Sequence, residues 1–167
     1  MSRASYQELL EAGVHFGHLT RKLNPNMAPF IFIEKEGIHV IDLNKTLVKL
    51  EESAKALHHI AKSGRKILFV STKKQAKGIV ERLVKPLGMP YVTERWPGGM
   101  LTNFHTIRKS IKKMSNLDKM SKDDTTFSSL SKKERLTIVR QKGKLEKNLG
   151  SISDMTRLPA AIFVIDI

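Results

Sequence analysis

The sequence predicts an α/β fold in which a doubly wound parallel sheet carries an inserted helical hairpin. Buried-strand patterns alternate with amphipathic helix patterns, which is typical of βαβ units. The stretch between the last two strand patterns is far longer than a single crossover needs. The net charge of +14 is concentrated in that same stretch, where residues 104–150 alone carry 13 basic and 5 acidic side chains. These observations set the inserted stretch apart from the sheet.

The N-terminal segment predicts a short helix followed by a loop. Ser5 and Glu8 have the spacing of a capping box, and Gly13 suits the C-terminal end of a helix over about 6–12. We interpret the next segment, GVHFGHLTRKLNPNM at 13–27, as a loop with a turn around its Asn-Pro-Asn sequence.

The remaining elements of the predicted sheet follow from hydrophobic periodicity. Apolar residues spaced three and four apart predict helices, and short apolar runs bounded by polar residues predict buried strands. The expected strands are two short ones within 29–43, one at 66–71, a short one at 91–93 and one at 160–167. The expected helices of the sheet region cover about 43–61 and 76–87.

Two further helices, about 103–120 and 132–149, form the predicted hairpin. The second helix begins with the capping-box pair Ser131 and Glu134. Between the helices, the polar segment SKDDTTFSS at 121–129 is interpreted as the connecting loop.

This organisation predicts two domains. Residues 1–103 and 151–167 form the α/β body, and residues 104–150 form the basic hairpin. A strand at 160–167 of such a fold needs a following helix to cover the sheet. We therefore expect the body to be incomplete at its C-terminus, within a longer protein.

The composition limits the possible functions. Lys and Arg number 30 against 16 Asp and Glu, and the pI of about 10.1 implies a polyanionic partner. The absence of cysteine excludes a disulfide framework, a thiolate zinc site and a cysteine nucleophile. Neither a signal-peptide pattern nor an apolar run of membrane-spanning length is found, so we expect a soluble intracellular protein.

A nucleotide- or phosphate-binding enzyme of the doubly wound class is the alternative function. Neither GxGxxG nor GxxxxGK[ST] occurs. The segment after the strand at 66–71 reads TKKQAKG, with three lysines and no glycine where a phosphate needs close backbone approach. These lysines could touch an exposed phosphate but cannot enclose one. We expect no cofactor and no small-molecule substrate.

Histidines and carboxylates offer few catalytic arrangements. His15 and His18 lie three positions apart without a cysteine or a nearby acidic partner, so packing histidines and a structural metal ion both stay open. Asp42 is expected to cap the helix that follows it. Asp166 lies near the C-terminal end of its strand, where doubly wound enzymes place active groups, but it has no paired carboxylate.

The basic hairpin and the loop RWPGGM at 95–100 favour nucleic acid as the partner. Like charges accumulate on both helices, and release of counterions from a phosphate backbone rewards many Lys and Arg contacts. Trp96 either stacks on a base or anchors the loop in the body. A membrane-binding helix would need more Trp, Phe and Leu. The residues expected to contact RNA are Arg21, Lys22, Asn24, Lys73, Lys74, Arg95, Trp96, Gly98, Gly99, Asn103, His105, Arg108, Lys109, Lys112, Lys113, Lys132, Lys133, Arg140 and Lys144.

Six ordered motifs resemble the bacterial small-ribosomal-subunit protein S2 family. They are GVHFGH (13–18), LNPNMAPFIF (23–32), GIHVIDLNKT (37–46), STKKQA (71–76), RWPGGMLTN (95–103) and LPAAIFVID (158–166). The resemblance implies a flavodoxin-like sheet with a protruding coiled-coil hairpin. It also implies a non-catalytic, cytoplasmic role in the ribosome, where the protein binds small-subunit ribosomal RNA and other ribosomal proteins and helps dock the large RNA-binding protein numbered one.

The sequence departs from the pattern of this family at three positions. Leu23 stands where many members have Trp, Ser71 replaces a common Gly, and Pro97 replaces a common bulky apolar residue. None of the three lies in the basic hairpin.

Overall fold

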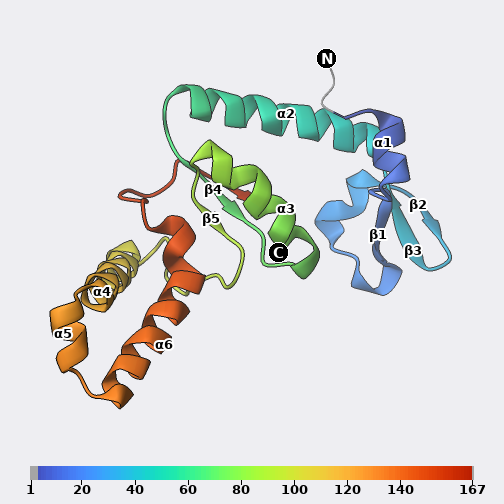
Figure 1. The fold of residues 1–167 in the computed structure, drawn as a ribbon. Helices are drawn as coiled ribbons and strands as arrows, with labels where there is room; N and C mark the ends of the chain where they lie inside the picture. Colours follow the sequence, from blue (N-terminus) through green and yellow to red (C-terminus); the bar gives the residue numbers. More distant parts are fainter. Residues whose placement is uncertain (1–3, 167) are drawn as a thin grey trace. The chain divides into compact units, whose positions relative to one another are not determined.

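The computed structural model describes residues 4–166, apart from the side chains of 124–126. The chain divides into two compact units, Met1–His59 and Ile60–Ile167. The first contains a small antiparallel sheet, and the second contains a parallel sheet and the hairpin (Figure 1). The α/β class is thus confirmed. The division into a body and a hairpin domain stays a prediction.

The first unit opens with helix α1 (Tyr6–Glu11), which has the predicted capping box. The amide of Glu8 donates to Ser5 Oγ over 3.2 Å, and the Ser5 amide donates to the Glu8 carboxylate over 2.7 Å. At the other end Gly13 has φ of +73°, and its amide donates to the carbonyl of Leu10. The left-handed glycine satisfies a carbonyl that the helix leaves free.

Strands β1 (Phe16–Leu19), β2 (Ile31–Lys35) and β3 (Ile38–Ile41) form an antiparallel sheet in the order β1-β3-β2. The hairpin of β2 and β3 confirms the strands predicted around the turn at Gly37. It also shows that the loop predicted at 13–27 is wrong, because β1 and the 3₁₀ helices η1 (Thr20–Lys22) and η2 (Pro25–Phe30) occupy most of it.

Pairing with a distant strand explains why β1 escaped sequence analysis. Phe16 lies opposite Val40, and a Cβ on Gly17 would come within 2.8 Å of the His39 carbonyl oxygen. The glycine that permits this close approach also weakens the local strand signal.

Helix α2 (Leu43–Lys62) begins as predicted. The Asn44 amide donates to Asp42 Oδ1 over 2.9 Å, which confirms Asp42 as the cap. The helix ends before Gly64, whose φ of +72° stops it.

The second unit is built on strands β4 (Ile67–Val70), β5 (Tyr91–Val92) and β6 (Ala161–Val164). They are parallel, in the order β5-β4-β6. Central strand β4 is buried, as predicted. The strand predicted at 160–167 is confirmed as β6, but its expected burial is wrong. Among the described strands β6 pairs only with β4, and its Ile162 and Val164 are 38% and 48% exposed.

Two layers of helix cover the central strand. Leu68 and Val70 join Val92 in a core that includes residues of the hairpin base, and successive residues of a strand point to opposite faces. Ile67 and Phe69 therefore face the other side, where helix α3 (Lys74–Val84) buries Val80 and Val84. The 3₁₀ helix η3 (Lys85–Leu87) and Gly88 end this crossover.

The inserted stretch forms helices α4 (Phe104–Lys122) and α6 (Lys132–Leu149), followed by η4 (Gly150–Ile152). The Ser131–Glu134 capping box of α6 is confirmed. The loop predicted at 121–129 is wrong, because a short helix α5 (Asp124–Ser129) fills most of it. Its first turn is closed by the Phe127 amide, which donates to the Asp123 carbonyl over 2.8 Å. Ser, Thr and Asp suit a turn, but they equally suit a helix N-terminus.

Candidate nucleic-acid interface

The inner face of the hairpin consists of apolar residues that join the two long helices to the sheet. Helix α4 packs against α6. Ile107 and Leu149 are buried in the same core as Leu68, and Phe104 and Leu145 pack against it. The predicted three-and-four spacing of the apolar residues therefore places the base of the hairpin firmly on the sheet.

An acidic bridge fixes the helices of the hairpin to each other further out. Asp118 of α4 accepts from Lys122 at 2.8 Å and from Lys142 of α6 at 2.5 Å. The hydrogen bonds from Lys122 and then Lys142 lower the pKa of the Asp118 carboxyl to about 2. Arg135 also lies on the inner face, half-buried. These two α6 cations, Arg135 and Lys142, are therefore not part of the outer surface.

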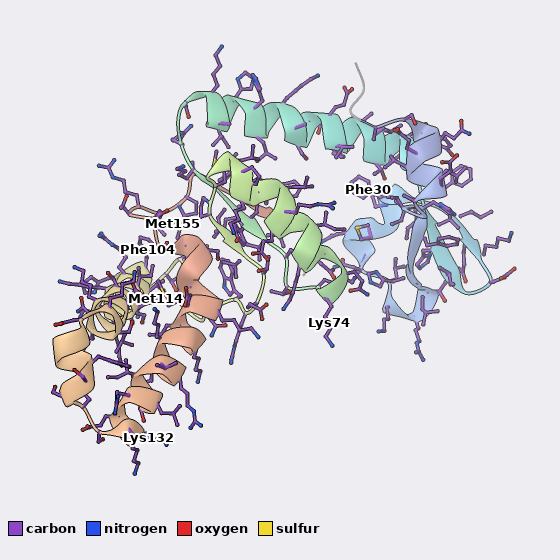
Figure 2. The ribbon with its side chains drawn as sticks, viewed as in Figure 1. Phe30, Lys74, Phe104, Met114, Lys132 and Met155 are labelled. Carbon is purple, nitrogen blue, oxygen red and sulfur yellow. The ribbon has the colours of Figure 1, made fainter. Side chains whose placement is uncertain are left out.

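The outer face of the hairpin carries exposed cations for which the described residues show no acidic partner. Within residues 4–166, no described ion pair involves any of the eight hairpin cations predicted to contact RNA. Lys132 projects from the start of α6 away from the hairpin (Figure 2). We call this set the outer cations: Arg108, Lys109, Lys112, Lys113, Lys132, Lys133, Arg140 and Lys144.

A second acidic bridge lies at the base of the hairpin. Glu94 is 3.3 Å from Lys77 Nζ of α3 and 3.5 Å from Lys147 Nζ of α6. The hydrogen bond from Lys77 is the main reason that the pKa of Glu94 falls below its usual value. Sequence analysis missed this role of Glu94, because both partners are distant in the chain. The ion pair between Asp118 and Lys122 differs, because its i,i+4 spacing on one helix could have been recognised in the sequence.

The structure supports the anchoring role of Trp96, whereas its stacking on an RNA base stays a prediction. Trp96 is half-buried and packs against the core, and it also lines a pocket of about 310 Å³. Gly99 has φ of +73°, and a Cβ there would lie 3.1 Å from Asn103 Cβ, whereas a Cβ on Gly98 would meet nothing within 4 Å. Asn103 accepts a hydrogen bond from Thr106 over 2.8 Å at the start of α4.

The other predicted RNA contacts are distributed over both units. Arg21 and Lys22 are exposed on η1, and Asn24 uses its side chain to accept from the Asn26 amide over 3.0 Å. The remaining residues belong to the second unit: Arg95 and His105 are exposed, Lys73 pairs with Asp166 at 2.7 Å, and Lys74 points away from the start of α3 (Figure 2).

His15 and His18 lie in different surroundings. His15 packs its ring against Phe16 with the centroids 4.1 Å apart, and its buried Nδ1 has no hydrogen-bond partner among the described residues. His18 is exposed on β1. No group of three or more His, Cys, Asp or Glu residues suited to a metal ion occurs in the described part of the chain.

None of the helices within residues 4–166 is long and apolar enough to cross a bilayer.

Comparison with known proteins identifies the family. Residues 9–167 match the family described as Ribosomal protein S2. The small ribosomal subunit protein uS2 of Flavobacterium johnsoniae is 66% identical over 99% of this chain, and that of Parabacteroides distasonis is 63% identical over the whole chain. The chain spans 65% and 60% of the length of these two relatives. On this evidence, the chain belongs to the ribosomal protein S2 family.

Proposed function

We propose that the chain is a structural, non-catalytic constituent of the small ribosomal subunit that binds ribosomal RNA chiefly through the outer cations of the hairpin. Relatives that share more than 60% of its residues carry the name of a small-subunit ribosomal protein. The observation that carries the RNA-binding role is the set of eight exposed hairpin cations that have no acidic partner among the described residues.

The free energy of this binding comes mainly from counterion release. Each phosphate that a Lys or Arg neutralises frees condensed cations from the RNA, and the gain grows with the number of contacts. The outer cations repel one another in the free protein, so a polyphosphate partner relieves this repulsion. The apolar residues between α4 and α6 and the ion pairs of Asp118 already hold the two helices together. The hairpin therefore loses little conformational entropy when it binds RNA.

The finer features of the proposal follow the family resemblance. We propose that β5-β4-β6 belongs to a flavodoxin-like, doubly wound sheet, that the hairpin is a coiled coil, and that the protein acts within cytoplasmic ribosomes. Docking of the large RNA-binding ribosomal protein numbered one is part of the proposal. Leu136 and Val139, which are 49% and 51% exposed on α6, support a protein contact beside the RNA-binding surface.

The test is incorporation into the particle. A tagged copy of the chain is expressed in bacteria, and lysates are separated on a sucrose gradient after a high-salt wash. We expect the chain to sediment with small subunits and to crosslink to their RNA through α4 and α6. If the folded chain stays at the top of the gradient while complete small subunits form, the proposal is wrong.

A further inference from the structure

The outer cations divide equally between the two long helices of the hairpin. Four belong to α4 and four belong to α6, and all of them are exposed. The two helices run side by side and are joined through α5 (Figure 1). The direction in which each set of four points therefore decides how many RNA segments the hairpin can hold. We call the two sets the α4 edge (Arg108, Lys109, Lys112 and Lys113) and the α6 edge (Lys132, Lys133, Arg140 and Lys144).

The α4 edge points away from α6. Ile107 and Leu117 are buried, and Asp118 pairs with Lys142 of α6, so these residues mark the inner side of α4. An α-helix turns by about 100° per residue, which places the mean direction of the four α4 cations roughly 170° from that inner side. The α4 edge therefore lies on the side of the helix that is opposite α6.

The α6 edge points away from α4 in the same manner. Leu149 is buried, Leu145 packs against the core, and Lys142 pairs with Asp118 of α4, so these residues mark the inner side of α6. The mean direction of the four α6 cations lies roughly 180° from that side, by the same turn of about 100° per residue. Because the inner sides of the two helices face each other, the two edges point in opposite directions.

The distance between the two edges keeps one short RNA segment from touching both. A helix with its side chains is about 10–12 Å across, so the α4 and α6 edges lie roughly 20 Å apart. Physiological salt screens the interaction of exposed charges beyond about 8 Å. Each edge therefore attracts phosphates independently, and RNA bound at one edge leaves the other available.

The outer surface of the hairpin suits the phosphates of a duplex better than the bases of an unpaired strand. Recognition of unpaired bases relies on exposed rings on which the bases stack. Phe104 packs against the core, Phe127 is half-buried, and residues 104–149 contain no Trp or Tyr. Only the ring of His105, at the start of α4, is exposed among the described aromatic and histidine side chains of this stretch. Rows of Lys and Arg without a stacking surface fit the regular phosphate rows of duplex RNA.

Two exposed apolar residues on α6 lie beside most of its cations. Leu136 and Val139 point in a mean direction that is about 90° from that of Lys133, Arg140 and Lys144, by the turn of the helix. The apolar pair and these three cations therefore form neighbouring stripes on one helix. An RNA duplex on the cationic stripe leaves the apolar stripe for the protein contact proposed above.

We propose that the hairpin bridges two RNA duplexes, one held at the α4 edge and the other at the α6 edge. The inference rests on the proposed RNA-binding function and adds to it a second RNA segment on the opposite side of the same hairpin. The ion pair between Asp118 and Lys142 keeps the two edges back to back, so the chain holds the duplexes at a set separation. In the complete ribosomal RNA both duplexes belong to one molecule, so binding at one edge raises the effective concentration at the other.

The test counts how many duplexes one chain holds. The full chain is mixed at physiological salt with donor-labelled and acceptor-labelled RNA duplexes of one sequence, each about one helical turn long. Duplexes of this length are too short to wrap around the hairpin. We expect energy transfer between the labels when RNA is in modest excess, and sedimentation velocity should show a complex of two duplexes and one chain.

Variants of each edge separate bridging from binding. One variant replaces the four cations of the α4 edge by Gln, and the other replaces those of the α6 edge, because Gln removes the charge and keeps a good helix former. We expect each variant to bind one duplex and to lose the energy transfer. The matched control replaces four exposed cations of the same unit outside the hairpin and should still bind two duplexes; these are Lys62, Arg65, Arg82 and Lys85. Circular dichroism confirms that each variant keeps its helices.

The wild-type chain decides the inference even if a variant fails to fold. A complex of one duplex and one chain, without energy transfer, would overturn bridging while leaving RNA binding in place. Energy transfer that survives in both folded edge variants would overturn it as well, because the duplexes would then meet somewhere other than the two edges. If the wild-type chain binds no RNA, the proposed function itself fails.

Discussion

The outer face of the hairpin and the carboxyl edge of the parallel sheet are both basic, but they hold their charge differently. The outer cations, such as Arg108 and Lys112, have no acidic partner within the described residues. At the edge of the sheet, Lys73 pairs with Asp166 and Lys77 pairs with Glu94. Cations without acidic partners on a helical hairpin give strong, salt-dependent attraction to any phosphate backbone. Lysines that are already paired with acids, as at the edge of the sheet, contribute less to such attraction, so binding there depends more on the shape of the ligand.

Two acids, one within the hairpin and one at its base, explain why the hairpin can carry so much charge. Asp118 and Glu94 neutralise the cations that lie between or beneath the helices, at positions where repulsion would separate them. The remaining cations face outward, where water screens them. The structure thus places Asp118 and Glu94 where they hold helices together and leaves the outer cations without such partners among the described residues.

The largest effect is expected from reversing charges on α4. The combined variant Arg108→Glu, Lys109→Glu, Lys112→Glu and Lys113→Glu should weaken binding to small-subunit RNA by about 10³-fold and lower the salt slope by about 3 to 4. Filter binding over a salt series measures both. The control reverses Lys66, Arg82 and Lys85, which are exposed basic residues outside the hairpin. Equal losses in the two variants would show that the hairpin has no special role.

The next effect concerns the core that joins the two regions. Leu68→Ala should lower the free energy of unfolding by about 3 kcal/mol, because Leu68 is fully buried between the sheet and the hairpin base. Urea titration followed by Trp96 emission and by far-ultraviolet circular dichroism should show coincident transitions. Leu87→Ala, at a residue that is 64% exposed, is the control. Separate transitions would mean that the hairpin and the sheet do not unfold as one unit.

A smaller effect distinguishes the two glycines of the Trp96 loop. Gly99→Ala should cost ~1–2 kcal/mol of stability, since φ is +73° and the new Cβ would approach Asn103 Cβ to 3.1 Å. Gly98→Ala should change the stability by less than about 0.5 kcal/mol, because a Cβ there meets nothing within 4 Å. Chemical denaturation of both variants gives the comparison. Similar values for the two would contradict the predicted turn geometry.

The smallest effect is a pH dependence within the hairpin. The pKa of Asp118 is about 2 in the folded chain, below its ordinary value of 3.8, so its contribution to stability is complete above about pH 4 and is lost as the pH falls through 2. Asp118→Asn should be less stable than the wild type at neutral pH, and the two stabilities should converge toward pH 2. A difference that is constant from pH 5 to pH 2 would assign the loss to something other than the ion pairs.

Local chemistry determined much of this protein from sequence alone. The capping boxes at Ser5 and Ser131, the cap at Asp42, the apolar spacing of α4 and the buried pattern of β4 all act within one turn or one strand. Each therefore leaves a readable signal in neighbouring residues. Most of the basic surface was equally predictable, because the charged residues of an amphipathic helix lie mainly on the face opposite its apolar residues, with Arg135 and Lys142 as the exceptions.

Tertiary structure alone decided the features that depend on distant partners. Strand β1 exists because β3 pairs with it, Glu94 bridges helices that lie far apart in the chain, and Ser71 is fully buried with no hydrogen-bond partner for its Oγ among the described residues. The half-exposed state of β6 likewise depends on what lies beside it in the sheet. Sequence patterns encode which surfaces a segment must bury, but the groups that meet across the fold are chosen only when those surfaces pack together.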